Sequence, residues 1–137
     1  MSAGEVSTEL LEELIRRARR ASEVAYCRYS QFPVGAALLT ATGRIQTGCN
    51  VENASYGLTC CAERSAVFAM VGQGERAFQA IVIYTPKATP TAPCGACRQV
   101  LNEFGADALV VSACDGPELR RWRMSELLPD AFGPGNL

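Results

Sequence analysis

The chain has 137 residues, of which 48% are hydrophobic and 20% charged, and its 13 basic and 14 acidic side chains leave a formal net charge of -1. This length fits a single domain, 1–137, and the balanced charge gives no support for a nucleic-acid partner, so we expect none. The chain has no histidine, which excludes Ser-His and Cys-His nucleophiles and leaves cysteine or carboxylate as ligands for any zinc site.

Hydrophobic periodicity and the positions of Gly and Pro predict the secondary structure. In chain order we expect a helix over 8–26, hairpin strands over 34–40 and 44–49, a helix over 60–71, a strand over 80–85, a helix over 94–104, strands over 108–113 and 119–124, and a short helix from 125. Thr59 is the expected N-cap of the second helix. Strands separated by helices imply crossover connections, so the fold class is α/β, a three-layer α/β/α sandwich with a mixed five-stranded sheet.

Neither the N-terminal segment nor the apolar runs predict export or membrane insertion. Residues 1–11 lack a basic segment followed by an apolar one, so we expect no signal peptide. The longest apolar runs, 34–39 and 108–113, are far shorter than the roughly 20 residues that cross a bilayer. We therefore expect a soluble, cytoplasmic protein without a membrane partner.

Seven cysteines need an explanation in such a chain. They are Cys27, Cys49, Cys60, Cys61, Cys94, Cys97 and Cys114. An odd number at uneven spacing does not indicate a disulfide framework. The clustered cysteines favour metal binding or catalysis, and the scattered Cys27, Cys49 and Cys114 are expected to be small buried hydrophobic residues.

Cys94 and Cys97 form a CxxC motif directly after Pro93, at the start of a predicted helix. A helix N-terminus has free amide groups and a partial positive charge, which stabilise the thiolate form that binds metal. Alone, this pair fits a redox dithiol, half of a structural zinc site, or chance.

A second motif, Cys61-Ala62-Glu63, separates these possibilities. Cys61 can supply a third ligand, and three protein ligands leave the fourth position of a zinc ion for water, as in catalytic sites. Glu63 follows at an offset that lets its carboxylate lie beside the metal and move protons. A ligand-x-Glu motif followed by Pro-Cys-x-x-Cys is the pattern of zinc deaminases. The two motifs together favour a catalytic zinc over a redox dithiol or a purely structural metal.

The charge of such a site predicts a basic neighbour. Three thiolates and one Zn²⁺ sum to -1, a charge that would raise the pKa of bound water. A guanidinium bonded to sulfur would offset it, and Arg64 is the expected counter-charge. Arg98 also follows the motif closely, although an ordinary position on the helix surface explains it equally well.

With these residues in place, the chain resembles the cytidine deaminase family, specifically its small homotetrameric branch with three cysteine ligands. The resemblance runs over nearly the whole chain and rests on residues 26–39, 48–64, 93–104 and 126–134. It implies a cytidine deaminase, a hydrolase that converts free cytidine and 2'-deoxycytidine to uridine and 2'-deoxyuridine plus ammonia in pyrimidine salvage. It also implies one Zn²⁺ per chain and a homotetramer whose active sites are completed by neighbouring subunits.

The resemblance assigns roles to individual residues. Cys61, Cys94 and Cys97 would bind zinc, and Glu63 would be the general acid and base. The implied substrate-binding residues are Phe32, Asn50, Glu52, Ala54, Tyr56, Ala62 and Phe132. Of these, Asn50 and Glu52 would bind the ribose hydroxyl, whereas Ala54, Tyr56 and Phe132 would reach a neighbouring subunit's site.

Several alternatives stay open at this point. Phe32 and Phe132 also fit plain packing roles, and Cys60 departs from the family by standing where an apolar residue or Thr is common. A deaminase of a cytosine-containing antibiotic would share the zinc motif. A zinc-stabilised binding protein without catalysis and a metal-free thiol oxidoreductase are the alternatives from other classes.

Overall fold

The structure is a computed structural model that describes residues 6–137. In chain order its elements are α1 (Thr8–Ser22), β1 (Gly35–Thr40), β2 (Ile45–Cys49), the 3-10 turn η1 (Tyr56–Leu58), α2 (Ala62–Gly72), β3 (Phe78–Tyr84), α3 (Gly95–Phe104), β4 (Leu109–Ala113), β5 (Arg120–Arg123), α4 (Met124–Leu127) and the 3-10 turn η2 (Pro134–Asn136). We expect no signal peptide in residues 1–11, and residues 1–5 of that segment lie outside the described residues.

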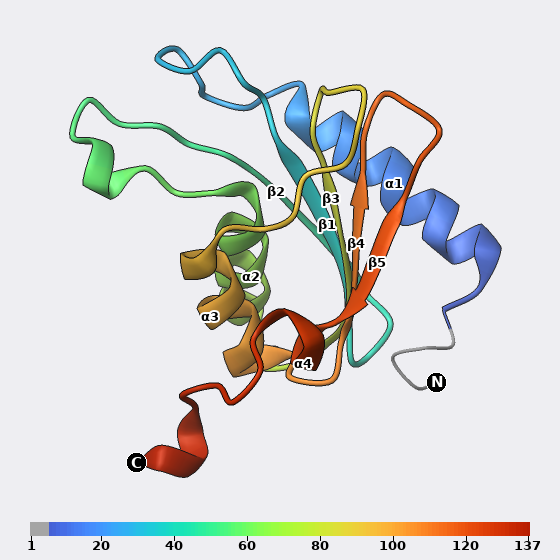
Figure 1. Cartoon of the computed structure of the whole chain (residues 1–137), viewed down its shortest axis with the longest axis vertical. Coiled ribbons are helices and arrows are strands. Elements are labelled where there is room, and N and C mark those ends of the chain that lie inside the picture. Colours follow the sequence, from blue (N-terminus) through green and yellow to red (C-terminus); the bar gives the residue numbers. More distant parts are fainter. Residues whose placement is uncertain (1–5) are drawn as a thin grey trace.

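The five strands form one mixed sheet in the order β2-β1-β3-β4-β5. The β3–β4 pair is parallel and the other pairs are antiparallel. In Figure 1, α1 covers one face of the sheet, and α2 and α3 cover the other. The helix α3 lies on the connection between the parallel strands, as a crossover requires. The predicted three-layer α/β/α sandwich with a mixed five-stranded sheet is confirmed.

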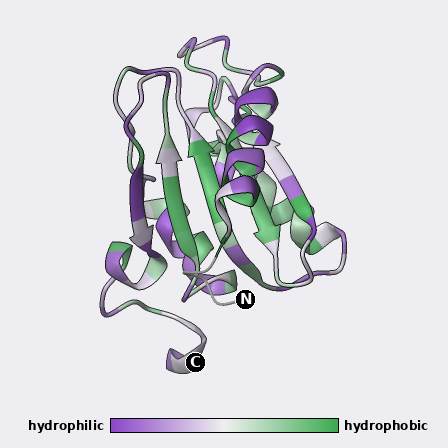
Figure 2. Cartoon of the chain, turned by 90° about the vertical axis from the view of Figure 1, so that its right-hand side faces the viewer, coloured by the Kyte–Doolittle hydropathy of each residue, from purple (hydrophilic) through white to green (hydrophobic). Residues whose placement is uncertain are grey.

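Strand β3 carries apolar side chains on both of its faces. Val82 and Tyr84 pack with Leu14 on the α1 side, whereas Ile81 and Ile83 pack in the core beneath α2 and α3. Successive residues of a strand point to opposite faces, so a strand covered on both sides has a continuous apolar sequence. Figure 2 shows these central strands as hydrophobic, with hydrophilic residues along the outward side of α1.

The first helix is shorter than its sequence pattern predicts. Ser7 caps α1 by accepting a hydrogen bond from the Leu10 amide at 3.2 Å, and the helix ends at Ser22 instead of Tyr26. The Tyr26 amide donates to the Asn50 carbonyl at 3.0 Å, so its backbone joins an extended segment beside Val51.

Even α1, the longest helix at 15 residues, is shorter than a bilayer requires, and no helix in residues 6–137 has the length and apolar character of a membrane span.

The start of α2 also differs from the prediction. Cys61, not Thr59, is the N-cap residue, and no side chain caps this helix. The Thr59 hydroxyl accepts a hydrogen bond from the Asn53 amide at 3.2 Å, and Cys60 pairs with Val51 through two backbone hydrogen bonds. Because these bonds keep residues 59–60 extended, the helix begins two residues later than expected and Cys61 lies at its tip.

Gly48 allows α2 to lie against β2. A Cβ atom at this position would lie 2.7 Å from the Ala62 carbonyl oxygen and closer still to the Ala66 amide nitrogen. Real Cβ atoms do not approach backbone atoms this closely, so only glycine fits here. This contact fixes the first turn of α2, which carries Glu63.

Candidate active site

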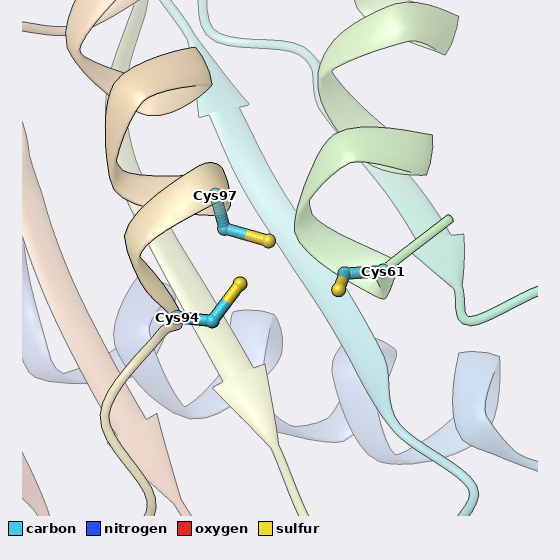
Figure 3. Close-up of side chains that lie close together, drawn as sticks. All are labelled: Cys61, Cys94 and Cys97. Carbon is cyan, nitrogen blue, oxygen red and sulfur yellow. The ribbon is translucent and has the colours of Figure 1, made fainter. Parts of the chain in front are cut away.

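Three cysteine sulfurs meet where α2 and α3 begin. Cys61 and Cys94 are the N-cap residues of α2 and α3, and Cys97 lies in the first turn of α3. Their Sγ atoms all lie within 4.8 Å of one another. Figure 3 shows Cys94 and Cys97 projecting from α3 toward the start of α2. Cys60 lies outside this cluster, and its sulfur contacts the Ser65 hydroxyl at 3.6 Å.

The donor set fits one zinc ion. Sulfur ligands at the roughly 2.3 Å Zn–S distance of a tetrahedral site lie about 3.8 Å from one another, so the observed spacing needs only small side-chain movements. Three ligands from the protein leave one position open, which is typical of a catalytic zinc rather than a structural one.

The cluster already favours a thiolate at Cys61. The pKa of Cys61 is lowered to about 5, mainly by a hydrogen bond from the Cys97 thiol and also by the hydrogen bond and positive charge of Arg64. The same shared proton raises the pKa of Cys97, together with burial. Metal ligation requires deprotonated sulfur, so a bound zinc would displace the proton that Cys61 and Cys97 share, as well as that of Cys94.

The two arginines near the motif have different partners. Arg64 Nη2 lies 3.5 Å from Cys61 Sγ and donates to the Thr59 carbonyl at 3.2 Å. This is the position that we expected for the charge that offsets the thiolates. Arg98 instead donates to the carbonyls of Pro93 at 2.8 Å and Leu127 at 3.1 Å, so it ties the loop before Cys94 to α4.

Glu63 lies in the first turn of α2 and is 5% exposed. Burial raises the pKa of its carboxyl, and the negative charge of the Cys61 thiolate raises it further. A carboxyl with a raised pKa beside a metal site can both accept and return a proton near neutral pH. Its position and environment therefore fit a general acid and base.

A cavity of about 290 Å³ opens in front of these groups. Five segments line it: the loop before β1, the segment between β2 and α2, the start of α2, the end of β3 and the loop before α3. The lining residues are Ser30, Phe32, Val34, Asn50, Glu52, Thr59, Cys61, Ala62, Glu63, Ile83, Thr85, Thr91, Ala92, Pro93 and Cys94. The predicted residues Phe32, Asn50, Glu52 and Ala62 are among them. The cavity lies at the carboxyl end of the parallel strand β3, a common place for ligands in α/β sheets.

Asn50 and Glu52 both face this cavity, and both also organise the neighbouring loop. The Asn50 amide group accepts from the Val34 amide and donates to the Phe32 carbonyl, each at 2.9 Å. The Glu52 carboxylate accepts from the amides of Tyr29 and Ser30, at 2.9 and 3.1 Å, and from the Ser30 hydroxyl. That hydroxyl bond lowers the pKa of Glu52, so its carboxylate stays ionised and keeps capacity to accept further hydrogen bonds.

Three predicted substrate residues lie outside the cavity of their own chain. Ala54 is exposed, Tyr56 is 75% exposed and Phe132 is 59% exposed. The Tyr56 ring stacks edge-on against Tyr29 at a centroid distance of 6.1 Å, beside Glu52 and next to the main cavity. The Phe132 carbonyl accepts a hydrogen bond from Gln99 at 2.9 Å, which holds the C-terminal segment on α3.

The sequence patterns did not single out the part of the cavity wall formed by Ile83, Thr85 and Thr91. Ile83 was predicted only as a strand residue, and the proline-rich segment 86–93 only as a loop. The signal that could have found them is the end of a buried strand followed by a loop that leads into a metal-binding motif, because side chains at such strand ends meet at one edge of the sheet.

Comparisons with known proteins agree with this geometry. Residues 8–113 match the sequence model of the cytidine and deoxycytidylate deaminase zinc-binding region. The chain is 43% identical over 129 residues to a cytidine deaminase of Sporosarcina psychrophila, covering 93% of this chain and 94% of that one. It is 48% identical over 120 residues to a cytidine deaminase of Halalkalibacterium halodurans, covering 87% and 91%.

Solved structures of cytidine deaminases have the same overall fold. The crystal structure of cytidine deaminase from Burkholderia pseudomallei superposes with a TM-score of 0.85 at 48% identity, covering 88% of this chain and 98% of that one. The corresponding values for cytidine deaminase from Mycobacterium tuberculosis are 0.79 and 43%, covering 94% and 99%. Residues 8–113, which match the family's sequence model, contain the clustered cysteines Cys61, Cys94 and Cys97 as well as Glu63. The chain therefore belongs to the cytidine and deoxycytidylate deaminase family.

Proposed function

We propose that this protein is a zinc-dependent cytidine deaminase that hydrolyses cytidine and 2'-deoxycytidine to uridine and 2'-deoxyuridine plus ammonia, in pyrimidine salvage. The observation that carries the proposal is the three-sulfur cluster beside the buried carboxyl of Glu63, in the wall of a cavity of about 290 Å³. High identity to proteins named cytidine deaminase along most of the chain supports the same substrate.

The proposed chemistry divides between the metal and Glu63. Cys61, Cys94 and Cys97 would hold the zinc, which when bound lowers the pKa of water toward neutrality and so supplies the nucleophile. Glu63 accepts the proton that this water loses and delivers it to ring N3 as C4 is attacked. The same carboxylate then takes the proton of the new C4 hydroxyl and passes it to the 4-amino group, so that ammonia leaves as the C4 carbonyl of the product forms. Its burial supports both transfers, because a raised pKa balances proton uptake and release.

The remaining cavity residues fit a nucleoside. We propose that Phe32 packs against the substrate, that the Ala62 backbone bonds the base, and that Glu52 accepts a hydrogen bond from a ribose hydroxyl. Asn50 donates one of its two amide hydrogens to the Phe32 carbonyl, which leaves the other for the sugar. A free base would leave the remaining hydrogen-bonding capacity of Asn50 and Glu52 unused, so a substrate with a sugar is favoured.

The exposed Ala54, Tyr56 and Phe132 support sites that are shared between subunits. In Figure 1 the segment around η1 and the C-terminal turn η2 both extend away from the sheet and its helices. We propose a homotetramer in which these segments complete neighbouring sites. Light scattering across a dilution series, with turnover measured on the same samples, tests this: activity should disappear as the tetramer dissociates, and a fully active monomer would contradict it.

The proposed compartment is the cytoplasm, with a free nucleoside as the small-molecule partner. All seven cysteines are free thiols in the structure. A site that depends on three thiols is suited to a reducing compartment.

A substrate panel tests the proposed function. Zinc-loaded protein is incubated with cytidine, 2'-deoxycytidine, cytosine, cytidine 5'-monophosphate and a cytosine-containing nucleoside antibiotic, and loss of the 4-amino group is followed by ultraviolet absorbance. We expect turnover of the two free nucleosides well above the others. Exclusive turnover of the antibiotic or the phosphate would show that the scaffold is right and the substrate wrong, and no turnover of any compound would favour a non-catalytic zinc protein.

A further inference from the structure

Thr85 is the residue directly after β3, and its hydroxyl lies in the wall of the active-site cavity. The residue is 4% exposed and lines the cavity with Glu63 and Cys94. Its Oγ1 atom has no hydrogen-bond partner among the protein groups of residues 6–137. A buried hydroxyl without a partner is unfavourable, so one that persists in a binding cavity points to a ligand that completes it.

The strand geometry directs this side chain toward the site. Ile83 faces the core beneath α2 and α3 and lines the cavity, whereas Tyr84 faces α1. The Thr85 amide still donates to the Ala113 carbonyl at 3.2 Å, which continues the pairing of β3 with β4. Because successive strand residues alternate between faces, Thr85 shares the face of Ile83 and the cavity.

A neighbouring hydroxyl on the same face shows what a structural role looks like here. Ser112 lies opposite Ile83 in β4, and its hydroxyl donates to the Thr91 carbonyl at 2.7 Å, holding the loop that borders the cavity. Two other buried side-chain atoms in residues 6–137 lack partners, Arg64 Nε and Gln79 Oε1, but neither residue lines the cavity. Among the cavity-lining side chains of residues 6–137, Thr85 is the one whose hydroxyl is both buried and without a partner.

We propose that Thr85 Oγ1 hydrogen-bonds the polar edge of the pyrimidine base, at the position where the amino group of the substrate becomes the carbonyl of the product. This inference rests on the proposed function. A hydroxyl can accept from an amino group and donate to a carbonyl by rotating its hydrogen. It therefore binds substrate and product about equally, and contributes to affinity and to recognition of the base rather than to the chemical step.

The test compares four variants with the zinc-loaded parent: Thr85→Val, Thr85→Ala, Thr85→Ser and Thr40→Val. Thr40 is the matched control, because its buried hydroxyl is at the far end of β1 and is already bonded to the Arg44 amide at 3.0 Å. For Thr85→Val we expect KM for cytidine and the inhibition constant of uridine to rise together by about tenfold, with kcat within about threefold. Thr85→Ala should show the same pattern if the Val variant folds poorly.

The two remaining variants separate a substrate contact from a packing role. Thr85→Ser keeps the hydroxyl and should stay within about twofold of the parent in KM. Thr40→Val should lose thermal stability without a change in KM, since it removes a hydroxyl that has protein partners. The proposal is overturned if Thr85→Val and Thr85→Ala keep the parent's KM and uridine inhibition, or if Thr85→Ser is as impaired as they are. A parent inactive on cytidine would instead refute the proposed function itself.

Discussion

The two faces of the sheet differ in what lies next to the apolar core. One face packs against α1, and the other packs against α2 and α3. Beneath α1, Leu14 and Ala18 pack against Val82 and Val111 in a continuous core. On the other face the core ends at a cavity in whose wall Glu63 is buried beside the cysteine cluster. One face therefore contributes mainly stability, whereas the other also holds the reactive groups, and substitutions on the two faces should separate these properties.

The largest effect should follow removal of a proposed zinc ligand. Cys94→Ala leaves two sulfurs at the site, so zinc content should fall from about one ion per chain toward zero, with loss of measurable turnover. Zinc is measured by atomic emission after gel filtration. Cys114→Ala, which truncates a buried cysteine outside the cluster, should keep its zinc. One tightly held zinc per chain in Cys94→Ala would show that the ligand set is wrong.

Glu63→Gln should reduce kcat for cytidine by about 10² to 10⁴-fold while zinc stays bound, because the amide cannot carry the proton. Glu75→Gln is the matched control, because Glu75 is a partly exposed carboxylate that accepts a hydrogen bond from Thr42 at the other end of the sheet, and it should leave kcat unchanged. Steady-state kinetics on both variants measures this. A Glu63→Gln enzyme with parental kcat would exclude the proton-transfer role.

Glu63→Gln should also become more stable relative to the parent as pH rises. Burial raises the pKa of Glu63 above its unfolded value, so its favourable contribution is complete below the unfolded pKa and is lost as pH rises through the folded pKa. Glutamine is never ionised, so the melting temperature of Glu63→Gln relative to the parent should increase between about pH 4 and the folded pKa. A relative loss of stability over that range would contradict the assignment.

Core truncations on the two faces should give similar stability losses but different kinetics. Leu14 in α1 and Leu101 in α3 are both fully buried, so each Leu→Ala change should lower the free energy of unfolding by about 2–5 kcal/mol. Only Leu101 lies one turn after Cys97, so only Leu101→Ala should also weaken zinc binding. Urea unfolding and zinc competition measure both quantities. Equal zinc affinity in the two variants would contradict a separation by face.

The smallest effect is expected at the counter-charge. Arg64→Gln removes a guanidinium 3.5 Å from Cys61 Sγ, and kcat/KM at pH 7 should fall by about tenfold because a more negative site activates water less well. The acidic limb of the pH–rate profile should move to higher pH for the same reason. Arg20→Gln on the exposed side of α1 is the control, and an unshifted profile in Arg64→Gln would argue against this role.

The sequence predicted the layers, the mixed sheet and the spacing of the cysteine motif, because these depend on local periodicity and on helix ends. It misplaced the ends of α1 and α2, where backbone bonds of Tyr26 and Cys60 to residues of the segment 50–51 outweigh local preference. The predicted cap at Thr59 was wrong for the same reason. Such long-range pairing leaves no periodic pattern in a single sequence.

Within the candidate site, prediction was best for residues in compact motifs. The roles of Cys61, Glu63 and Arg64 stay predictions, but the structure brings their side chains together as expected. No sequence pattern indicated that Asn50 and Glu52 are also bonded to the loop between Tyr29 and Val34. Nor could a pattern identify Thr85, since the lack of a hydrogen-bond partner becomes visible only when the surrounding side chains are placed.

Titration of zinc into metal-free protein tests the central claim most directly. Cytidine turnover is measured after each addition, with protein concentration fixed and free thiols kept reduced. If the cysteine cluster and Glu63 form a zinc-dependent deamination site, turnover should rise linearly from a negligible level and stop rising at about one zinc per chain. Full turnover without metal, or a zinc-saturated protein that leaves cytidine unchanged, would contradict it.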